Sequence, residues 1–299
     1  MKIIREIEGK APEIWRIINK FGWSPQHNYC LFKNYGRKGE LPVFFVGEHG
    51  GLFAYQKKDV WRILTDSIAP AAQDLKFFLS VIDWIFQNKP TQKIILEDIS
   101  EDFRREILAA AKTKNWRATK PSYSLFWPRI DLKNWDQNLA GGQWKRLRNI
   151  YNKFFKENKV EFSSPAEVGK KELLKIAVKW KKQRHDNDRV HFEQYLRFIE
   201  NNFEGCDLIR IMIISGRPSA INGGWRIPNS QNYYSYLGLY DYDFKGIGEV
   251  SYIDEFNQAK KMGFEKIDLG GSYGGLLDFK MKFHPTEIYR TDTFSILKR

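Results

Sequence analysis

The stretch from Tyr236 to Pro285 constrains the fold of this chain more than any other part of the sequence. It opens with an aromatic and apolar strand pattern over residues 236–240, followed by a glycine loop over 244–248. A helical pattern runs from there to residue 262. A second short strand pattern, over residues 266–269, ends in another glycine loop. This order of elements predicts an α/β unit that binds a ligand at its strand ends.

Both glycine loops are candidate anion sites. Glycine has no Cβ, so backbone N–H groups can approach a phosphate or carbonyl oxygen, and a helix N-terminus adds positive potential. We therefore predict that the two loops bind the donor substrate, through Lys245, Gly246 and Gly248 in the first and through Gly270, Gly271 and Ser272 in the second. The alternative for the first loop is an ordinary turn into a helix.

The same motifs resemble known families. Lys245-Gly246-Ile247-Gly248, together with Ala259 to Phe264, resembles the pyrophosphate loop and following helix of the GNAT acyltransferase superfamily. Leu269-Gly270-Gly271 and Phe279 to Pro285 resemble the end of the C-terminal catalytic domain of phosphatidylglycerol lysyltransferases, which are akin to the Fem peptidyltransferases. The resemblance is best over about the last two thirds of the chain. It implies an α/β (α+β) fold of two tandem GNAT-like domains, each a mixed twisted sheet flanked by helices.

A faint internal repeat agrees with tandem domains. Lys93-Ile94-Ile95-Leu96 and Lys266-Ile267-Asp268-Leu269 share a Lys-Ile-x-Leu frame between similar helices and loops. The first copy lacks the glycine loops. We therefore expect a degenerate N-terminal domain over residues 1–136 and a catalytic C-terminal domain over residues 137–299. The site should lie between the strands over 236–240 and 266–269, where sheets of the resembled family splay apart.

The remaining elements follow from hydrophobic periodicity and from turn and cap residues. Helices are predicted over residues 11–21, 70–88, 100–114, 165–180 and 191–203, and around the apolar stripe of Leu147, Ile150, Tyr151, Phe154 and Phe155. Strands are predicted over residues 42–46 and 52–55 as a hairpin, 93–96, 122–127 halted by Pro128, 160–163, 208–215, 220–227 and 232–240 as a meander, and 286–297 as one or two strands.

Two residues are candidates for catalysis. The resemblance to Fem-type transferases implies that Lys280 is an electrostatic stabiliser near the donor, and Tyr273 is a candidate base or proton donor. From its helical position we expect Lys280 to be exposed, so its alternative role is that of a solvated surface lysine. Lys282 lies two residues further on and points another way on a helix.

A serine hydrolase is the main alternative chemistry for the second loop. Gly270-Gly271-Ser272-Tyr273-Gly274 fits a nucleophile elbow centred on Ser272. That chemistry also needs an acid and then a histidine downstream, and His284 directly after the loop does not supply that context. We therefore do not expect a hydrolase.

The charge of the chain favours polyanionic partners. The formal net charge is +13, which fits contact with RNA, phosphate-bearing donors or anionic lipid surfaces. The richest basic patch is Trp144 to Asn149, which resembles the run that opens the catalytic half of the lysyltransferase family. Its Lys145, Arg146 and Arg148 are candidate contacts for tRNA phosphates. The alternative is a solvated helix face.

Several classes are not expected. The two cysteines, Cys30 and Cys206, lie far apart and form no metal motif. The segment from His185 to His191 favours a polar loop over a metal site, so we expect no metal and no tightly bound cofactor. The apolar run over residues 77–86 is too short to span a membrane, and no signal peptide is evident. We expect a cytoplasmic protein, with peripheral membrane contact left open.

Together these observations predict an acyltransferase that resembles lysylphosphatidylglycerol synthases. It would move an aminoacyl group from aminoacyl-tRNA, or another acyl group, to an amine or hydroxyl acceptor. The alternatives are a GNAT-type N-acyltransferase that uses acyl-CoA, and a non-catalytic RNA- or partner-binding protein on the same fold.

Overall fold

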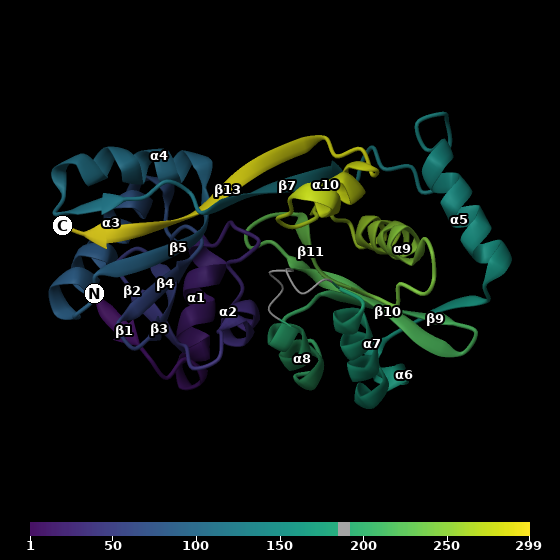
Figure 1. The fold of residues 1–299 in the computed structure, drawn as a ribbon, viewed down its shortest axis with the longest axis horizontal. Helices are drawn as coiled ribbons and strands as arrows, with labels where there is room; N and C mark the ends of the chain where they lie inside the picture. The colour runs from purple at the N-terminus through teal and green to yellow at the C-terminus, as the bar shows by residue number, and fades with distance from the viewer. Residues whose placement is uncertain (185–191) are drawn as a thin grey trace.

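A single mixed sheet runs through the molecule in this computed structural model, which describes residues 1–184 and 192–299 (Figure 1). Within these residues the strand order is β1-β2-β3-β4-β5-β13-β7-β12-β11-β10-β9-β8, and β6 pairs with β13. Helices lie on both faces of the sheet (Figure 1). The predicted mixed α/β architecture is therefore confirmed.

The first half of the sheet is built from the N-terminal strands. They are β1 (Lys2–Ile4), β2 (Leu41–Val46), β3 (Gly51–Lys57), β4 (Val60–Leu64), β5 (Lys93–Ser100) and β6 (Trp116–Ala118). The predicted hairpin is the antiparallel pair of β2 and β3. Alternation along β2 sends Val43 and Phe45 to one face and Phe44 to the other, so each face has its own core.

Helices cover both of these faces. The core around Val43 and Phe45 is completed by α3 (Ala71–Asn88) and α4 (Glu101–Ala110), while α1 (Ala11–Phe21) and α2 (Tyr29–Tyr35) pack on the core around Phe44. Short 3₁₀ turns, η1 (Glu8–Lys10) and η2 (Ala111–Thr113), precede α1 and follow α4.

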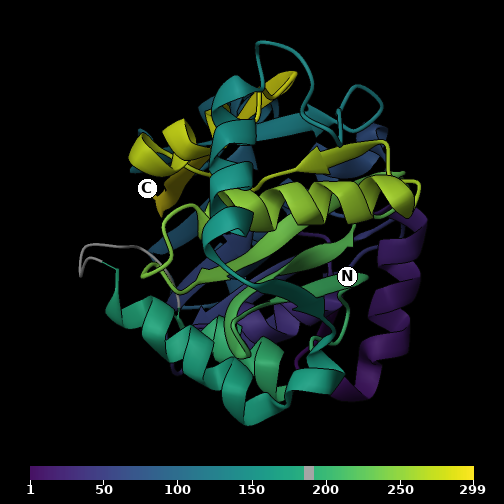
Figure 2. The same ribbon diagram turned by 90° about the vertical axis from the view of Figure 1, so that its right-hand side faces the viewer.

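The second half carries the rest of the sheet. Its strands are β7 (Tyr123–Asp131), β8 (Val160–Ser163), β9 (Leu208–Ile214), β10 (Arg217–Arg226), β11 (Asn232–Tyr240), β12 (Lys266–Asp268) and β13 (Glu287–Lys298). Its helices are α5 (Lys145–Glu157), α6 (Pro165–Val168), α7 (Lys170–Lys182), α8 (Phe192–Glu200), α9 (Ile247–Lys261) and α10 (Gly274–Met281). Figure 2 shows α9 on one side of the strands and α7 on the other. The predicted meander is confirmed by antiparallel pairing of β9 with β10 and of β10 with β11.

Two long strands connect the halves. β7 lies before the predicted boundary at residues 136 and 137, yet it pairs with β12 of the second half. β13 lies after that boundary, and it pairs with β7 along residues 287–293 and with β5 along residues 291–297. The boundary itself stays a prediction, and the strands next to it are shared by both halves.

Two local expectations were wrong, and one helix was not predicted. Pro128 does not stop its strand, because proline lacks only the N–H and its carbonyl still accepts a hydrogen bond from Leu269 at 3.0 Å. The helix expected over residues 165–180 is two helices, since Gly169 adopts φ +81° between α6 and α7. Helix α2 was not predicted, although the Asn28 side chain caps it by accepting from the Leu31 amide at 2.9 Å.

The shared strand generates a stability prediction. Phe294 on β13 is 1% exposed and packs in the core beneath α3 and α4. Phe294→Ala should lower the free energy of unfolding by about 3–5 kcal/mol, the usual cost of emptying such a site. Ile288→Ala is the control, because Ile288 lies on the same strand and is 47% exposed. Denaturant unfolding measures both, and equal small losses would contradict the packing of β13 in the first half.

Candidate functional site

The sheet opens between β11 and β12. Their parallel pairing covers three residues and ends where Tyr234 lies opposite Asp268. Beyond that point the chain after β12 turns toward β7, with Ser272 bridging to Phe126, while β11 continues beside β10 to Tyr240. The predicted splay is therefore present at the expected strands. The backbone after Asp268 therefore has no strand pairing with β11.

The Lys280 side chain lies in this opening. α10 packs over the splay, and Lys280 is 4% exposed, with its Nζ donating to the Gly270 carbonyl at 2.9 Å. A Cβ at Gly270 would lie 3.3 Å from the Tyr234 ring and 3.7 Å from Lys280 Nζ, so ring and amine meet at this glycine. The expectation that Lys280 is an exposed surface lysine was wrong.

Burial changes the chemistry of this amine. It lowers the pKa of Lys280 to about 7, and the nearby Asp268 carboxylate acts in the opposite direction. A lysine with such a pKa exists in both protonation states near neutral pH, so it can donate or accept a proton there. An exposed lysine would stay charged and could act only as a fixed cation.

Asp268 anchors the strands on the other side of the opening. Its Oδ2 accepts from Arg129 Nε at 3.0 Å and from the Tyr289 hydroxyl at 2.8 Å, and its Oδ1 accepts from the Gly270 amide at 2.9 Å. Arg129 also lies 4.1 Å above the Tyr289 ring, which stacks on Trp127. Burial raises the pKa of Asp268, and Arg129 counters that shift.

Sequence reasoning missed Arg129 and Tyr289. They lie on β7 and β13, and only the register of these strands brings them to one carboxylate. The sequence offered no signal for that register.

The second glycine loop is less open than its sequence suggests. The Gly270 amide donates to Asp268, and the Ser272 amide donates to Phe126 O at 2.9 Å, so neither is free to bind a donor in this conformation. The Ser272 hydroxyl is buried and donates to the same Phe126 carbonyl at 3.2 Å. His284 contacts Gln143 O, at 3.2 Å, and not Ser272. Ser272 is thus not arranged as a nucleophile.

Tyr273 and Gly271 are placed differently. Tyr273 is the N-cap of α10 and is 50% exposed, so it lies at the surface and not beside the buried amine. A Cβ at Gly271 would lie 2.8 Å from Leu125 and 2.9 Å from Trp127. Glycine at this position is explained by close packing against β7.

The first glycine loop leads into α9. Gly246 is the N-cap residue, with φ +92°, and a Cβ there would lie 2.9 Å from Ile150 of α5. A Cβ at Gly248 would lie 3.2 Å from Phe279 of α10. The Ile247 amide donates to the Phe244 carbonyl at 3.2 Å and the Val250 amide to the Gly246 carbonyl at 3.1 Å. The amides of Gly248 and Glu249 therefore remain the candidate anion ligands of the first turn of α9, beside exposed Lys245. The short distances at Gly246 and Gly248 also show that the start of α9 packs closely against both α5 and α10.

The basic patch at the start of α5 divides into two parts. Lys145 and Arg146 are exposed. Arg148 is partly buried, and its guanidinium donates to the carbonyls of Leu139 and Gly141, which fixes the preceding linker. This use leaves Arg148 less free for tRNA phosphates than its two neighbours. His284, just beyond α10, contacts the ring of Trp144, so the patch adjoins the α10 end of the site.

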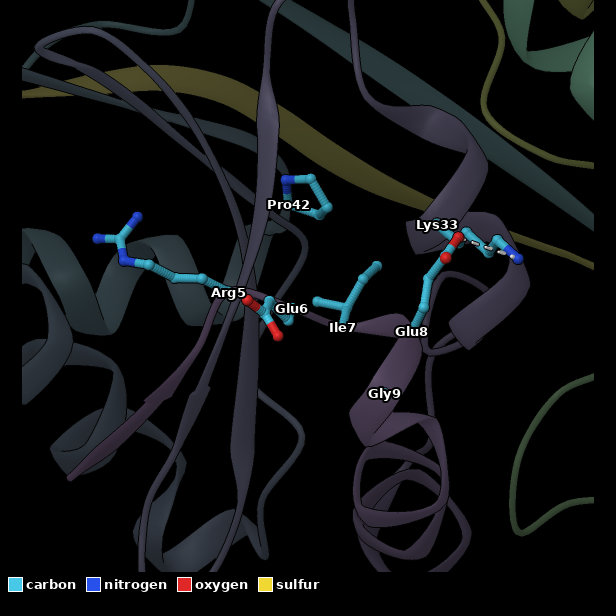
Figure 3. A pocket seen from close by; sticks show the side chains of 7 residues that line it. All are labelled: Arg5, Glu6, Ile7, Glu8, Gly9, Lys33 and Pro42. Atoms are coloured by element: carbon cyan, nitrogen blue, oxygen red, sulfur yellow. Dashed lines mark ion pairs between the residues drawn. The ribbon is translucent and has the colours of Figure 1, made fainter.

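A wider hollow lies elsewhere. Its volume is about 440 Å³, and it is formed around Arg5, Glu8, Lys33 and Pro42 of the first half (Figure 3). Lys33 pairs with Glu8 at 3.4 Å across it. It shares no lining residue with the splay, and its Lys33 is paired with Glu8 while Arg5 donates to Gln56, so we do not assign the site there.

Two further expectations concern metals and membranes. The segment from His185 to His191 lies outside the described residues. In the part of the chain that the structure does describe, no three metal-binding side chains gather, and no helix has the length and apolar character that a membrane crossing requires.

Comparison with known proteins supports the fold. No family model and no curated protein matches this chain. Solved structures do: L-PGS from Bacillus licheniformis is 16% identical with a TM-score of 0.71, covering 96% of this chain and 92% of that one. FemX is 11% identical with a TM-score of 0.65, covering 99% and 97%.

A third structure identifies the repeated unit. A tandem GNAT protein from the clavulanic acid biosynthesis pathway is 8% identical with a TM-score of 0.55, covering 98% of this chain and 97% of that one. At these identities the likeness establishes the fold. The chain has the tandem GNAT-like fold that its motifs predicted, and it is similar in structure to L-PGS and FemX.

The burial of Lys280 predicts a pH-dependent stability. Its folded pKa of about 7 lies below the ordinary lysine value of 10.5, so between these values the unfolded chain binds a proton that the folded chain does not. The cost of burying the amine is therefore complete below pH 7 and disappears toward pH 10.5. Lys280→Met, which removes the charge, should gain most over wild type at the acid end of this window. The gain should shrink with rising pH, by at most about 1.4 kcal/mol per pH unit.

Urea unfolding of wild type and variant from about pH 6 to about pH 10 measures this difference. Lys282→Met is the control, because Lys282 lies beside α10 but is partly exposed and paired with Glu249 at 2.8 Å. A gain for Lys280→Met that is constant across the window would mean that the amine stays charged in the folded state.

Proposed function

We propose that this protein transfers an aminoacyl or acyl group to an amine or hydroxyl acceptor at the splay between β11 and β12. The observation that carries the proposal is the buried Lys280 amine inside that opening, bonded to the Gly270 carbonyl at 2.9 Å. A buried amine with a lowered pKa at an opening in a sheet is a candidate for a functional group.

The proposed step balances without a further reactant. The acceptor nitrogen or oxygen bonds to the carbonyl carbon of the donor, and the carbon–oxygen bond of an ester, or the carbon–sulfur bond of a thioester, breaks. The acceptor releases one proton to water, and the leaving oxygen or sulfur takes one up. Lys280 in its ammonium form supplies that proton and stabilises the charge that develops before it moves.

Aminoacyl-tRNA is the donor that we favour. The exposed Lys145 and Arg146 lie at the end of α5 that adjoins His284 and α10, so a polyanion bound there would reach toward the site. The structural similarity to L-PGS and FemX also supports aminoacyl-tRNA as the donor, because the families that the sequence motifs resemble transfer aminoacyl groups. The net charge of +13 supports binding of a large polyanion.

Acyl-CoA is the second candidate donor. It is favoured by the glycine loop before α9, whose first-turn amides and exposed Lys245 could bind a pyrophosphate. A screen with CoA esters and with charged tRNA separates the two donors. Transfer of a labelled amino acid from tRNA would support the first, transfer of an acyl group from CoA the second, and binding without transfer would favour a non-catalytic role.

Lys280→Ala should slow transfer by about a hundred- to a thousandfold, the loss seen when a group that stabilises a developing charge is removed. Lys280→Arg should recover little, because a guanidinium stays protonated and cannot give up its proton. Single-turnover transfer from the donor found in the screen measures these rates. Lys282→Ala is the control and should stay within a few-fold of wild type. Equal small effects at both positions would remove Lys280 from the proposed chemistry.

The double variant Lys145→Gln/Arg146→Gln should bind tRNA with a weaker dependence on salt. Each lost phosphate contact lowers the slope of log affinity against log salt by about 0.7–0.9. The matched control is Lys153→Gln/Lys156→Gln, which removes the same charge from exposed positions further along α5. Filter binding of tRNA at several salt concentrations gives the slopes, and identical slopes for the two double variants would contradict this placement of the tRNA.

A further inference from the structure

A small cavity lies where the first half of the chain meets β7 and β13. Its volume is about 30 Å³, close to the space that one water molecule or one ammonium group occupies. Residues from both halves line it, chiefly Trp23, Asp66 and Asp98 from the first half and Trp127, Arg129 and Tyr289 from the shared strands. Trp23 is 46% exposed, so this wall of the cavity borders solvent.

Two buried carboxylates line this space, and neither forms an ion pair with another residue that the structure describes, although the more distant Arg62 acts on Asp98. Asp66 and Asp98 are 3% and 8% exposed. Asp66 Oδ1 accepts from the Ser100 amide at 3.1 Å, and Asp98 Oδ2 accepts from Gln26 Nε2 at 2.7 Å. Among residues 1–184 and 192–299, the ion pairs of neighbouring Arg62, Arg104 and Arg129 are all made with other acids.

Burial of this kind is costly. It raises the pKa of Asp66 and of Asp98 to about 7 each. An unpaired buried carboxylate destabilises the folded state unless a cation or a full set of hydrogen bonds compensates it. A positively charged group of a ligand, bound in the cavity, would compensate the charge of both carboxylates.

The walls favour an ammonium group over a metal ion. Trp23, Trp127 and Tyr289 bring aromatic rings to the cavity, and such rings attract organic cations. Hard divalent ions are usually held by several carboxylates, and no third acidic, histidine or cysteine side chain joins Asp66 and Asp98 among the residues that the structure describes. Arg129 also lines the cavity, but its charge is already compensated by Asp268 at 3.0 Å.

The backbone at the cavity is strained. Thr65 and Asp98 both line it and adopt φ of +61° and +53°, values that non-glycine residues rarely take. Each costs stability that the surrounding structure must supply. Thr65 and Asp98 thus both have an unfavourable backbone conformation at the cavity, which agrees with a binding role.

The cavity adjoins the proposed transfer site. Arg129 and Tyr289, which form its wall, are the two residues that bind Asp268, and Trp127 stacks on Tyr289. The other oxygen of Asp268 accepts from the Gly270 amide, and the Gly270 carbonyl accepts from the Lys280 amine, so hydrogen bonds connect the cavity wall to the transfer site. We propose that the cavity is a subsite for a primary ammonium group of the transfer substrate, held by Asp66 and Asp98. The inference rests on the proposed function for the identity of the substrate, but its binding test does not require transfer.

Binding of n-butylamine and of 1-butanol to the wild-type protein, measured by titration calorimetry, tests the charge requirement. The amine should bind and the alcohol, of the same length, should not. Asp66→Asn and Asp98→Asn keep an oxygen acceptor for Ser100 and Gln26 but remove the charge, so each should weaken amine binding by at least about tenfold, or about 1.4 kcal/mol. Asp74→Asn is the matched control, because Asp74 is a carboxylate of the same half that lies outside the cavity and bonds to Ser67.

A second series distinguishes the sources of the ammonium group. Norleucinamide carries only an α-ammonium, Nα-acetyl-lysinamide carries only a side-chain ammonium, and ethanolamine stands for a small amine acceptor. Any of them that binds wild type and loses about tenfold in Asp66→Asn and Asp98→Asn supports the subsite and names its source. Equal binding of butylamine and butanol, or amine binding unchanged in both variants, would overturn it.

Two further outcomes are decisive. Stabilisation of wild type by Mg²⁺ or Ca²⁺ that is lost in both variants would replace the ammonium subsite with a metal site. Lys280→Ala should bind the amines as wild type does even though transfer is lost, so failure of the transfer proposal and failure of the subsite give different results. Should Asp66→Asn and Asp98→Asn not fold, the wild-type comparison of amine with alcohol still decides the charge requirement.

Discussion

One buried carboxylate, that of Asp268, holds together the region on which the rest of the second half depends. It accepts three hydrogen bonds, which connect β12 to Arg129 on β7, to Tyr289 on β13 and to the amide of Gly270. These contacts draw the end of β12 toward β7, and β11 is left to continue alone with β10. The opening that contains Lys280 is a direct result of that choice of partner.

Much of this could be read from the sequence, because the signals were local. The strand, loop and helix order from residue 236 onward depends on glycine positions and short-range periodicity, and the splay appears between the strands that were expected. The burial of Lys280 could not be predicted in this way, because it depends on how α10 packs against the rest of the protein. Apolar residues are spread around α10, so its sequence does not show which side is buried. We expected Lys280 on the exposed side, and it lies on the buried one. Arg129 and Tyr289 depend on strand register, which no single-sequence pattern fixed.

The glycines show a related limit. A glycine in a loop signals that something approaches the backbone closely, but the signal does not say what. At Gly271 the close neighbours are Leu125 and Trp127, and at Gly248 the neighbour is Phe279, so part of the pattern that suggested a ligand reflects packing between elements. The small cavity lined by Asp66 and Asp98 had no such signal, since the two residues come from separate segments, one after β4 and one near the end of β5.

The strand shared between the halves also bears on how the chain folds during synthesis. β5 pairs with β4 early, but it obtains its second neighbour, β13, only when residues 291–297 have been made. The hydrogen bond from the Asp98 amide to the Thr293 hydroxyl joins positions 195 residues apart. Until then the edge of β5 is bare, and an exposed edge pairs readily with other chains. Contacts of such long range also slow folding. The first half is therefore synthesised early but completed last, and the nascent chain passes through a period in which it is prone to aggregate.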